Sequence, residues 1–567
     1  MTATVARPAP IPAPDARQEV LSLTHFRLML VMLLFIGATL VVAGRLAFLT
    51  VFTDRPSGER GNGGFAARAD IVDRNGMPLA SNIDAWSIAI HPSRLVNDPE
   101  DLAPRLAALM PEKTEAQYLA ILRSGKNFAY LSRRAMPELV QAVNAIGEPA
   151  IEFQREPERL YPQASLASHV LGFINRDGVG VGGIEGAFQQ RLSDPAQLGR
   201  PLALSIDSRV QAVMESELYA AMLKFQAIGA TGLVLDVHTG EVLALASLPS
   251  FNPNAAGRVP AEVRYNKATM GVYELGSTFK AITMAEGIES GVLKSMTQKY
   301  DATSPLHIGR FTIKDDHPKG RWLTVPEIMV YSSNIGTAQI AEQIGEQGMA
   351  SMFRKLGFDR KTDIEIPEKS LPLWPVYWGR TTVMTVAYGH GIAVTPLHLA
   401  NAYAAIVNGG IWRPATLLKR APGQVPAGRR VMAQSTSDRV RQLMRMVVMP
   451  ETGGTGKSAN APGFRVGGKT GTAEKPHNGG YARHSLVSTF AGVFPMDDPK
   501  YVVVAMLDEP KGTKDTYGFA TAGWTAGPVV NKVVSRVGPI LGVMPDETRD
   551  VDVSELMPLV APVTKGH

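Results

Sequence analysis

The 567-residue sequence contains no cysteine. This absence excludes disulfide bonds, thiolate metal sites and cysteine nucleophiles. It is compatible with an oxidising compartment, because a chain without thiols cannot form wrong disulfides there. The sequence also lacks a block of like charges: its net charge is +6, but lysines and arginines are interspersed with acids. This pattern predicts a mildly basic, solvated surface and no nucleic-acid partner.

Recognisable metal-binding patterns are missing as well. None of the 11 histidines belongs to a His-Glu-x-x-His motif. His390 and His398 stand eight positions apart, and a structural role is expected for both. We therefore expect neither a metal nor a cofactor.

Only the N-terminal region contains a long apolar run. Residues 28–44 (LMLVMLLFIGATLVVAG) carry no charge, and after Arg45 the apolar run resumes as far as Phe52. A membrane-spanning helix needs about 20 residues, whereas the apolar part of a cleaved signal peptide spans about 7–15. The length therefore favours an uncleaved anchor at 28–52 behind a tail of residues 1–27. Arginines occur on both sides of the run, so the positive-inside rule does not orient it.

The rest of the chain is too long for one ordinary domain, and hydrophobic residues make up 45% of the sequence, enough for real cores. Residues 53–200 mix short strand-like and helix-like runs and form a first region outside the membrane. In residues 201–545, strand-like hairpins at both ends enclose a long helical middle. This order predicts an α+β fold in which an antiparallel sheet packs between helices. Residues 546–567 are left as a C-terminal tail.

The first chemical motif is Ser277-Thr278-Phe279-Lys280, which opens a largely apolar, helix-like run. Side chains at positions i and i+3 share one helix face, so Ser277 and Lys280 can meet. Burial lowers the pKa of a lysine, which would make Lys280 a base for the Ser277 hydroxyl. Such a quartet arises often by chance. A helix cap followed by a surface lysine is the alternative when this motif is taken alone.

The second motif, Ser332-Ser333-Asn334, lies between two helix-like runs. At such a break, the side chains of Ser332 and Asn334 can point into one cleft, which positions i and i+2 of a helix cannot do. The alternative interpretation is an ordinary polar turn, because serine and asparagine are common there.

The third motif, Lys469-Thr470-Gly471-Thr472, ends a strand-like run. Thr470 and Thr472 share one face of a strand, where two hydroxyls could hold a carboxylate. Gly471 would let a substrate strand approach the backbone. Lys469 would point to the other face, so its stem would have to bend into the site. An exposed edge strand is the alternative.

Together the three motifs are far more specific than any one of them. They follow in the order that penicillin-binding proteins and class A β-lactamases share. The sequence resembles a class B penicillin-binding protein, with the division-specific branch most similar and the elongation-specific branch as the alternative. Further segments carry the resemblance: residues 68–76 (RADIVDRNG), 159–162 (RLYP), 182–186 (GGIEG), 266–268 (NKA), 273–277 (YELGS), 389–392 (GHGI) and 395–396 (TP). Two positions depart from it: Leu275 stands where many relatives have proline, and Ala164 where many have glycine.

The resemblance implies a location and partners. The N-terminus would be cytoplasmic, the anchor would cross the inner membrane once, and a periplasmic pedestal of the dimerisation type would carry the transpeptidase domain. The substrates would be peptidoglycan stem peptides, a donor ending in D-Ala-D-Ala and an amine acceptor, and β-lactams would be inhibitors. A polytopic glycan polymerase and other division proteins would associate with the chain at the septum.

The resemblance also assigns roles in the reaction. Ser277 would attack the donor carbonyl, Lys280 would take the serine proton, and Ser332 would pass a proton to the leaving D-alanine. Asn334 would bind the donor backbone, Lys469 would add positive charge, and Thr470, Gly471 and Thr472 would form the carboxylate-binding strand. The oxyanion hole would consist of the backbone N–H groups of Ser277 and Thr472.

Other functions remain open from the sequence. A serine D,D-carboxypeptidase or a β-lactamase would use the same nucleophile, but hydrolysis needs neither an anchor nor a pedestal. No acid can be assigned as the glutamate that activates a deacylating water in class A β-lactamases. A non-catalytic scaffold or β-lactam sensor is disfavoured, because Ser277, Lys280 and Lys469 are all present.

Overall fold

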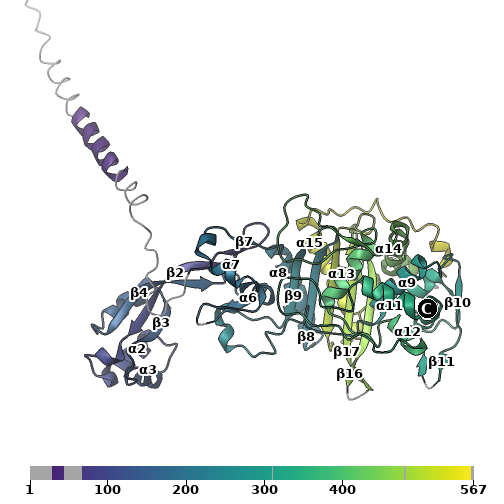
Figure 1. Cartoon of the computed structure of the whole chain (residues 1–567), viewed down its shortest axis with the longest axis horizontal. Helices are drawn as coiled ribbons and strands as arrows, with labels where there is room; N and C mark the ends of the chain where they lie inside the picture. Colours follow the sequence, from purple (N-terminus) through teal and green to yellow (C-terminus); the bar gives the residue numbers. More distant parts are fainter. Residues whose placement is uncertain (1–27, 44–66, 176, 310, 478–479, 563–567) are drawn as a thin grey trace, which may run out of the picture. The chain divides into compact units, whose positions relative to one another are not determined.

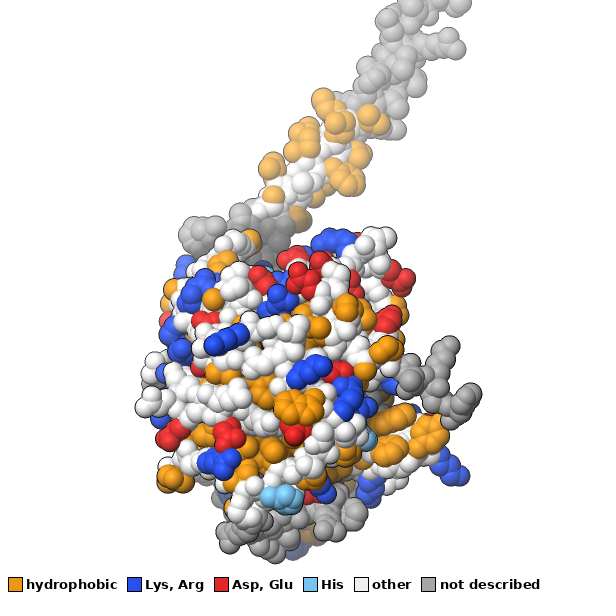
Figure 2. Space-filling model, turned by 90° about the vertical axis from the view of Figure 1, so that its right-hand side faces the viewer, with side chains coloured by type: hydrophobic (Ala, Val, Ile, Leu, Met, Phe, Trp, Pro, Cys, Tyr) orange, Lys and Arg blue, Asp and Glu red, His pale blue; other side chains and the backbone are white. Residues whose placement is uncertain are grey.

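The computed structural model describes residues 28–43 and 67–562, apart from residues 176, 310, 478 and 479. The chain divides into two units, Met1–Gly64 and Phe65–His567. In the first unit, residues 28–43 form a helix whose apolar side chains face outward (Figure 2). Among the described residues, no helix has both the length and the apolar character needed to cross a membrane. The rest of the predicted anchor and the tail of residues 1–27 lie outside the described residues, so the anchor stays a prediction.

The second unit begins with the pedestal, which is built on a five-stranded sheet (Figure 1). The long central strand of the sheet, β2, pairs with β3 on one side and with β4 on the other. Three helices cover this sheet and share a small core of Ile88, Leu106, Tyr118 and their neighbours. The elements are β1 (Ile71–Val72), β2 (Pro78–Ile90), α2 (Pro99–Leu109), α3 (Glu115–Leu122), β3 (Ala129–Ala135), α4 (Pro137–Asn144), β4 (Ile151–Leu160), α5 (Ser168–Leu171), β5 (Phe173–Ile174), β6 (Gly180–Val181), α6 (Gly183–Ala187), α7 (Gln189–Ser193) and β7 (Leu202–Ala203).

A buried ion cluster explains why three sequence segments of the pedestal stand out. The Glu185 carboxylate is fully buried and lies 2.9 Å from Arg68 Nη2 and 2.7 Å from Arg159 Nε. The Tyr161 hydroxyl donates to the same carboxylate at 3.3 Å. Removing Glu185 would leave two buried guanidinium groups without their carboxylate, and the loss of one partner of a buried ion pair typically costs about 3–5 kcal/mol. The segments 68–76, 159–162 and 182–186 are therefore three parts of one structural contact.

The catalytic domain is built on an antiparallel five-stranded sheet with the order β16-β17-β18-β8-β9. The strands are β8 (Gly229–Asp236), β9 (Val242–Leu248), β16 (Gly467–His477), β17 (Gly480–Phe494) and β18 (Tyr501–Asp508). Both predicted hairpins are confirmed, since β8 pairs with β9 and β17 pairs with β18. Smaller strand pairs are β10 (Lys299–Ala302) with β13 (Arg321–Thr324), β11 (Leu306–Ile308) with β12 (Phe311–Ile313), and β14 (Ile411–Trp412) with β15 (Arg429–Arg430).

Helices cover both faces of this sheet, as the α+β interpretation predicts. On one face, α8 and α15 bury Met214, Leu218 and Val530 against the strands. On the other face, α13 is buried along its whole length and lies between the sheet and the remaining helices. The helices are α8 (Ser208–Lys224), α9 (Lys280–Glu289), α10 (Val325–Val330), α11 (Asn334–Lys355), α12 (Arg380–Val386), α13 (Pro396–Val407), α14 (Gln434–Val448) and α15 (Ala526–Ile540).

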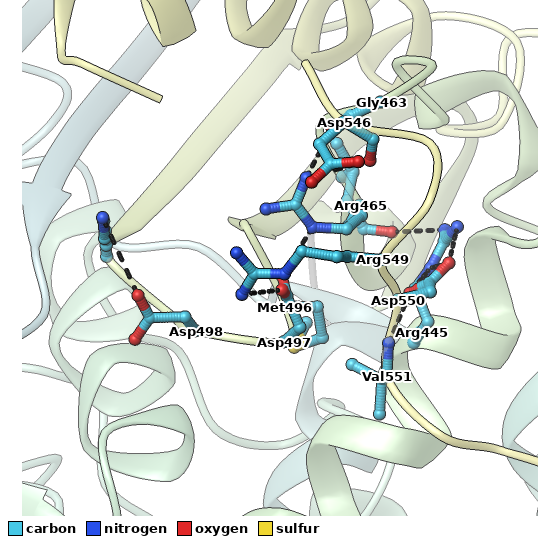
Figure 3. Close-up of polar contacts among 12 residues, drawn as sticks. Arg445, Gly463, Arg465, Met496, Asp497, Asp498, Asp546, Arg549, Asp550 and Val551 are labelled. Carbon is cyan, nitrogen blue, oxygen red and sulfur yellow. Dashed lines mark hydrogen bonds and ion pairs between the residues drawn. The ribbon is translucent and has the colours of Figure 1, made fainter. Parts of the chain in front are cut away.

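Residues 543–562 pack against the catalytic domain and are named here the C-terminal strap. Arg445 of α14 binds the Asp550 carboxylate with an Nη2–Oδ2 distance of 2.6 Å (Figure 3). Arg549 of the strap lies 2.9 Å from Asp497, which also pairs with Arg465 at 2.6 Å. Leu556 of the strap is buried in the main core. The predicted tail is thus a packed part of the domain as far as the description extends, to residue 562.

The end of the strap reaches the helix that precedes Ser332. Thr324, the N-cap of α10, donates from Oγ1 to the Leu559 carbonyl at 2.8 Å. The Tyr331 hydroxyl, at the other end of α10, donates to the Ala561 carbonyl at 3.2 Å. The strap therefore holds α10 at both ends.

Candidate active site

Ser277 lies in a tight turn that packs directly on the edge strand of the sheet. The turn is a short 3-10 helix, η4 (Gly276–Phe279), which leads into α9. Gly276 has a φ of +54°, and a Cβ there would lie 2.6 Å from the Thr472 carbonyl oxygen. A Cβ on Gly389 would lie 2.3 Å from the Gly276 carbonyl oxygen. The turn is thus held between β16 and the Gly389 loop, with backbone against backbone.

The structure gives Gly471 a packing role in addition to the expected one. A Cβ at this position would lie 2.2 Å from the Leu275 carbonyl oxygen and 2.7 Å from Thr278 Cγ2. Gly471 is therefore required for the close approach of the Ser277 turn, and its role in admitting a substrate strand stays a prediction. Leu275 itself is buried, with φ −96° and ψ 13°. This conformation lies in the bridge region of the φ/ψ map, which leucine can adopt.

Lys280 is fully buried and contacts the second motif, which confirms the predicted burial. Its Nζ donates to the Ser332 carbonyl at 2.5 Å, to Ser332 Oγ at 3.0 Å and to Asn334 Oδ1 at 2.7 Å. Burial lowers the pKa of Lys280 to about 7, although Asp315 and Asp316 act in the opposite direction. A substantial fraction of Lys280 is therefore neutral near pH 7, as a general base must be.

Ser332 brings the two catalytic-motif lysines together. It has a φ of +61°, a conformation that costs a residue other than glycine about 1–2 kcal/mol. Its Oγ accepts from Lys280 at 3.0 Å and from Lys469 at 2.9 Å. Both lone pairs of the hydroxyl are engaged, so its own hydrogen must point away from both lysines.

The predicted break between helices is confirmed, and an acid that the sequence did not single out supports it. Ser333 is the N-cap of α11, and its Oγ donates to Asp315 Oδ2 at 2.8 Å. Asp315 Oδ1 accepts from the Ile335 N–H at 2.9 Å. Asn334 Nδ2 donates to the Lys314 carbonyl at 3.0 Å. Asp315 thus fixes the turn that presents Ser332 and Asn334, and no motif spacing marks a residue so far upstream.

Lys469 is on the opposite face of β16 from the threonines, and this is the face that meets the Ser277 turn. Gly471, which shares its face by strand alternation, packs on Leu275 and Thr278. Lys469 Nζ lies 2.9 Å from Ser332 Oγ and also 3.2 Å from Oγ1 of the neighbouring Thr470. Burial and the nearby Lys280 hold the pKa of Lys469 well below its usual range.

Thr470 and Thr472 occupy the expected alternate positions of β16, which lies at the edge of the sheet and, among the described strands, pairs with β17 alone. Thr470 Oγ1 lies 2.9 Å from Thr455 Oγ1 and accepts from Lys469 Nζ at 3.2 Å. Thr472 Oγ1 accepts from the Ala522 N–H at 3.1 Å. Both hydroxyls are therefore fixed by neighbouring groups beside the buried lysine.

One predicted contact is not formed as a hydrogen bond. Within the described part of the chain, the Ser277 hydroxyl makes no hydrogen bond to Lys280, whose three contacts go to Ser332 and Asn334. Three donated hydrogen bonds require the ammonium form, because a neutral amine has only two N–H groups and one lone pair. Deprotonation of Lys280 would therefore release one acceptor and free a lone pair for Ser277.

Comparisons with known proteins agree with this geometry. Residues 230–534 match the family described as "Penicillin binding protein transpeptidase domain", and residues 64–194 match "Penicillin-binding Protein dimerisation domain". A "Probable peptidoglycan D,D-transpeptidase FtsI" of Caulobacter vibrioides is 40% identical over 497 residues, 85% of this chain and 83% of the relative. The "Peptidoglycan D,D-transpeptidase FtsI" of Escherichia coli K12 is 30% identical over 87% of this chain and 86% of its own length.

Solved structures show the same similarity. Penicillin-binding protein 3 of Mycobacterium tuberculosis, complexed with aztreonam, superposes with a TM-score of 0.68 at 26% identity and covers 88% of this chain and 99% of its own. The transpeptidase domain of penicillin-binding protein 3 from Burkholderia pseudomallei gives a TM-score of 0.54 at 32% identity. It covers 60% of this chain and 97% of its own.

Proposed function

The chain belongs to the penicillin-binding protein family of peptidoglycan D,D-transpeptidases, and we infer that its reaction passes through an ester on Ser277. One observation carries this inference: the Ser332 hydroxyl accepts from two fully buried lysines beside the Ser277 turn. The arrangement supplies a base with a pKa of about 7 and a hydroxyl that can pass on a proton.

In the acylation step, Ser277 Oγ attacks the carbonyl carbon between the two D-alanines of a donor stem peptide. Neutral Lys280 takes the serine proton as the C–O bond forms. The terminal D-alanine then leaves as its C–N bond breaks, and its nitrogen receives a proton from Ser332. Lys280 returns a proton to Ser332, so the serine proton has moved to the leaving amine.

The transition state and the donor terminus need positive or hydrogen-bonding groups around them. We assign the developing oxyanion to the backbone N–H groups of Ser277 and Thr472, and losing one such donor typically costs about 10²–10³ in rate. The donor carboxylate binds to the hydroxyls of Thr470 and Thr472 beside Lys469. Asn334, which Lys280 and Lys314 hold in place, binds the donor backbone.

In the second step, an amine of a neighbouring stem peptide attacks the ester carbonyl. The new C–N bond forms, the C–O bond to Ser277 breaks, and the amine proton returns through Ser332 and Lys280 to Ser277 Oγ. The product is a cross-link between two stem peptides. A β-lactam acylates the same serine, but its ring fragment stays attached and blocks the approach of the acceptor.

A covalent trapping experiment tests this function. Full-length protein incubated with benzylpenicillin is expected to gain the mass of the drug on Ser277. The adduct should persist for tens of minutes after the drug is removed, and the Ser277→Ala variant should gain no mass. Complete recovery of free enzyme within seconds would favour the β-lactamase alternative, and an unmodified wild-type protein would contradict the acyl-enzyme.

We further propose that residues 28–52 anchor the chain in the inner membrane, with the N-terminus in the cytoplasm and the catalytic domain in the periplasm. The apolar helix of residues 28–43 supports this. The similarity to proteins named FtsI supports work at the septum together with a polytopic glycan polymerase. Replacing residues 28–52 with an unrelated membrane helix should abolish co-purification with the polymerase and leave penicillin binding intact. Fluorescent penicillin confined to the side wall would favour the elongation-specific alternative.

A further inference from the structure

A cavity of about 180 Å³ is lined jointly by the pedestal and the catalytic domain. None of the residues that line it belongs to the three catalytic motifs. The pedestal contributes His169, Phe173, Gly182 and Gly183 among others, and the catalytic domain contributes Phe251, Arg264, Asn266 and Glu368. Pockets for drug-sized ligands measure about 300–1,000 Å³, so an occupant of this cavity must be smaller than that.

Asn266 brings an unsatisfied hydrogen-bond donor to this cavity. The residue is 1% exposed, and its Oδ1 accepts from the Ala268 N–H at 3.1 Å. Its Nδ2 is buried and makes no hydrogen bond within the described part of the chain. Buried polar groups in native proteins nearly always have a partner, so this amide calls for an acceptor inside the cavity. The segment 266–268 carries the family resemblance, yet it takes no part in the catalytic contacts described above.

Arg264 adds a positive charge that has no carboxylate partner among the described residues. Its Nε is buried without a hydrogen bond, and its guanidinium lies 5.7 Å from the centroid of the Phe173 ring. An aromatic face therefore positions this side chain in place of an acid. His169 Nε2 donates to the carbonyl of Val263 at 2.8 Å and fixes the backbone beside Arg264. Burial lowers the pKa of His169 to about 4, so its ring is neutral near pH 7 and adds no charge to the cavity.

Glu368 brings a negative charge to the same cavity. Its Oε2 accepts from the Gly183 N–H at 3.0 Å. A Cβ on Gly182 would lie 2.5 Å from Glu368 Oε1, so the carboxylate rests directly against the two glycines. Oε1 accepts no hydrogen bond from a described residue, and Glu368 forms no ion pair with Arg264. The cavity thus holds one positive and one negative side chain, each with hydrogen-bonding capacity left over.

We propose that this cavity binds a small zwitterionic α-amino acid, with its carboxylate on Arg264 and Asn266 and its ammonium group on Glu368. A guanidinium and an amide N–H are donors that suit a carboxylate, and charge-assisted hydrogen bonds are the stronger ones. A simple anion would instead stand beside the Glu368 carboxylate without a cation of its own. The proposed reaction supplies one such amino acid, the D-alanine that leaves when Ser277 is acylated. Other small amino acids share this chemistry, so the two sources must be distinguished by experiment.

Saturation-transfer NMR with D-alanine tests the site. Full-length protein in detergent is first acylated on Ser277 with benzylpenicillin, so that the active site is occupied. D-alanine, propionate and D-alaninamide are then titrated separately, since propionate lacks the ammonium group and D-alaninamide lacks the carboxylate. The wild type should bind D-alanine about tenfold more tightly than either analogue, because each analogue leaves one charge in the partly desolvated cavity without its partner.

A titration with L-alanine identifies the source of the ligand. Tighter binding of D-alanine would support the site and assign its occupant to the leaving group of the proposed reaction. Equal or tighter binding of L-alanine would support the site with free amino acids of another origin as its occupants.

Matched variants assign the binding to the cavity. Arg264→Gln and Glu368→Gln should each weaken the binding of D-alanine about tenfold. Glu368→Gln keeps an acceptor for the Gly183 N–H, so its fold should not change. Arg258→Gln and Glu262→Gln make the same chemical changes at exposed positions that do not line the cavity, and both should bind D-alanine like the wild type.

Two results would overturn the site. One is equal affinity of the wild type for D-alanine and its two analogues, or no saturation transfer to any of them. The other is D-alanine binding of wild-type strength in both Arg264→Gln and Glu368→Gln. Failure of benzylpenicillin to acylate Ser277 would instead contradict the proposed function, and the variants would still locate the binding of D-alanine.

Discussion

Lys469 Nζ donates a hydrogen bond to Ser332 Oγ at 2.9 Å across 137 positions of sequence. The same oxygen accepts from Lys280 at 3.0 Å, and both lysine side chains are fully buried. Two ammonium groups held on one oxygen away from water repel each other strongly, so the pair binds its protons one after the other. Burial lowers the pKa of Lys280 to about 7, so one lysine of the pair can be neutral near neutral pH.

The pH dependence of acylation should follow this pair. Because Lys280 must be neutral to accept the Ser277 proton, and burial lowers its pKa to about 7, the acylation rate should rise as the pH increases through about 7 and level off above it. Below the pKa, the rate should fall about tenfold for each pH unit. The acylation rate at each pH between 5.5 and 9 is measured by intact-mass spectrometry of samples that are quenched at set times after addition of benzylpenicillin. A rate that is flat across this range would exclude Lys280 as the base.

Ser277 and Lys280 should behave as one catalytic unit. Ser277→Ala is expected to abolish acylation, and Lys280→Ala should reduce its rate at least about 10³-fold, since nucleophile and base act in the same step. The double variant should be no worse than Ser277→Ala. Acylation of Lys280→Ala within about tenfold of wild type, or about 1.4 kcal/mol of barrier, would show that the base is another group.

Substitutions of Ser332 should lower the acylation rate and should differ in their effect on the free energy of unfolding. Both Ser332→Ala and Ser332→Gly remove the shared hydroxyl and should lower acylation by about 10²-fold or more. They differ in backbone cost, because glycine adopts the observed φ of +61° freely and alanine does not. Chemical denaturation should therefore give Ser332→Gly a free energy of unfolding about 1 kcal/mol above that of Ser332→Ala. Equal stabilities would argue against the left-handed conformation.

Adding a side chain at Gly471 should destabilise the protein, because the residue packs directly on the Ser277 turn. In Gly471→Ala, the new Cβ would lie 2.2 Å from the Leu275 carbonyl oxygen, so the turn must shift. We expect a loss of about 1–3 kcal/mol in unfolding free energy, together with a strong loss of acylation. Gly257→Ala is the control, because nothing lies within 4 Å of its Cβ. That variant should stay within about 0.5 kcal/mol of wild type.

The strap should contribute to stability through Asp550. Asp550→Ala leaves the Arg445 guanidinium, whose side chain is only 9% exposed, without its carboxylate. The expected loss is about 1–3 kcal/mol, measurable as a lower melting temperature. Arg549→Ala removes a neighbouring strap residue whose side chain is 60% exposed. Because exposed ion pairs contribute about 0–1 kcal/mol, this control should melt close to wild type. Similar melting temperatures for both variants would contradict the role of Asp550.

The sequence alone was sufficient to predict the residues of the site that belong to recognisable motifs. Ser277, Lys280, Ser332 and Lys469 were predicted from motif order, and burial of Lys280 followed from the apolar run around it. The support from Asp315 and the orientation of Lys469 were not predictable in the same way. Asp315 contacts Ser333, and Lys469 contacts Ser332 across 137 positions, so both depend on packing between segments that sequence spacing does not relate. The left-handed backbone conformation of Ser332 was likewise not predictable, because a serine in the sequence does not indicate a positive φ.

The buried ion pairs of the pedestal also could not be predicted from the sequence. The resemblance singled out the segments around Arg68, Arg159 and Glu185, yet spacing alone could not reveal that one buried carboxylate joins the first two. Ion pairs between distant segments leave no periodic pattern in the sequence, because the fold and not a fixed spacing brings the two partners together. The fold class was therefore predictable from the order of strands and helices, whereas the contacts that fix it were not.

The C-terminal strap also has a consequence for when the enzyme becomes competent. Asp550 holds Arg445, whose Nη1 donates to the Val466 carbonyl at 2.9 Å just before the strand that bears Lys469. Ala561 accepts from Tyr331, the neighbour of Ser332. Ribosomes make Asp550 and Ala561 after Lys469 and Ser332, so both residues of the site are synthesised before the strap contacts that support their neighbours. A nascent chain stalled near residue 540 would therefore carry the Ser277, Lys280, Ser332 and Lys469 side chains without the two strap contacts.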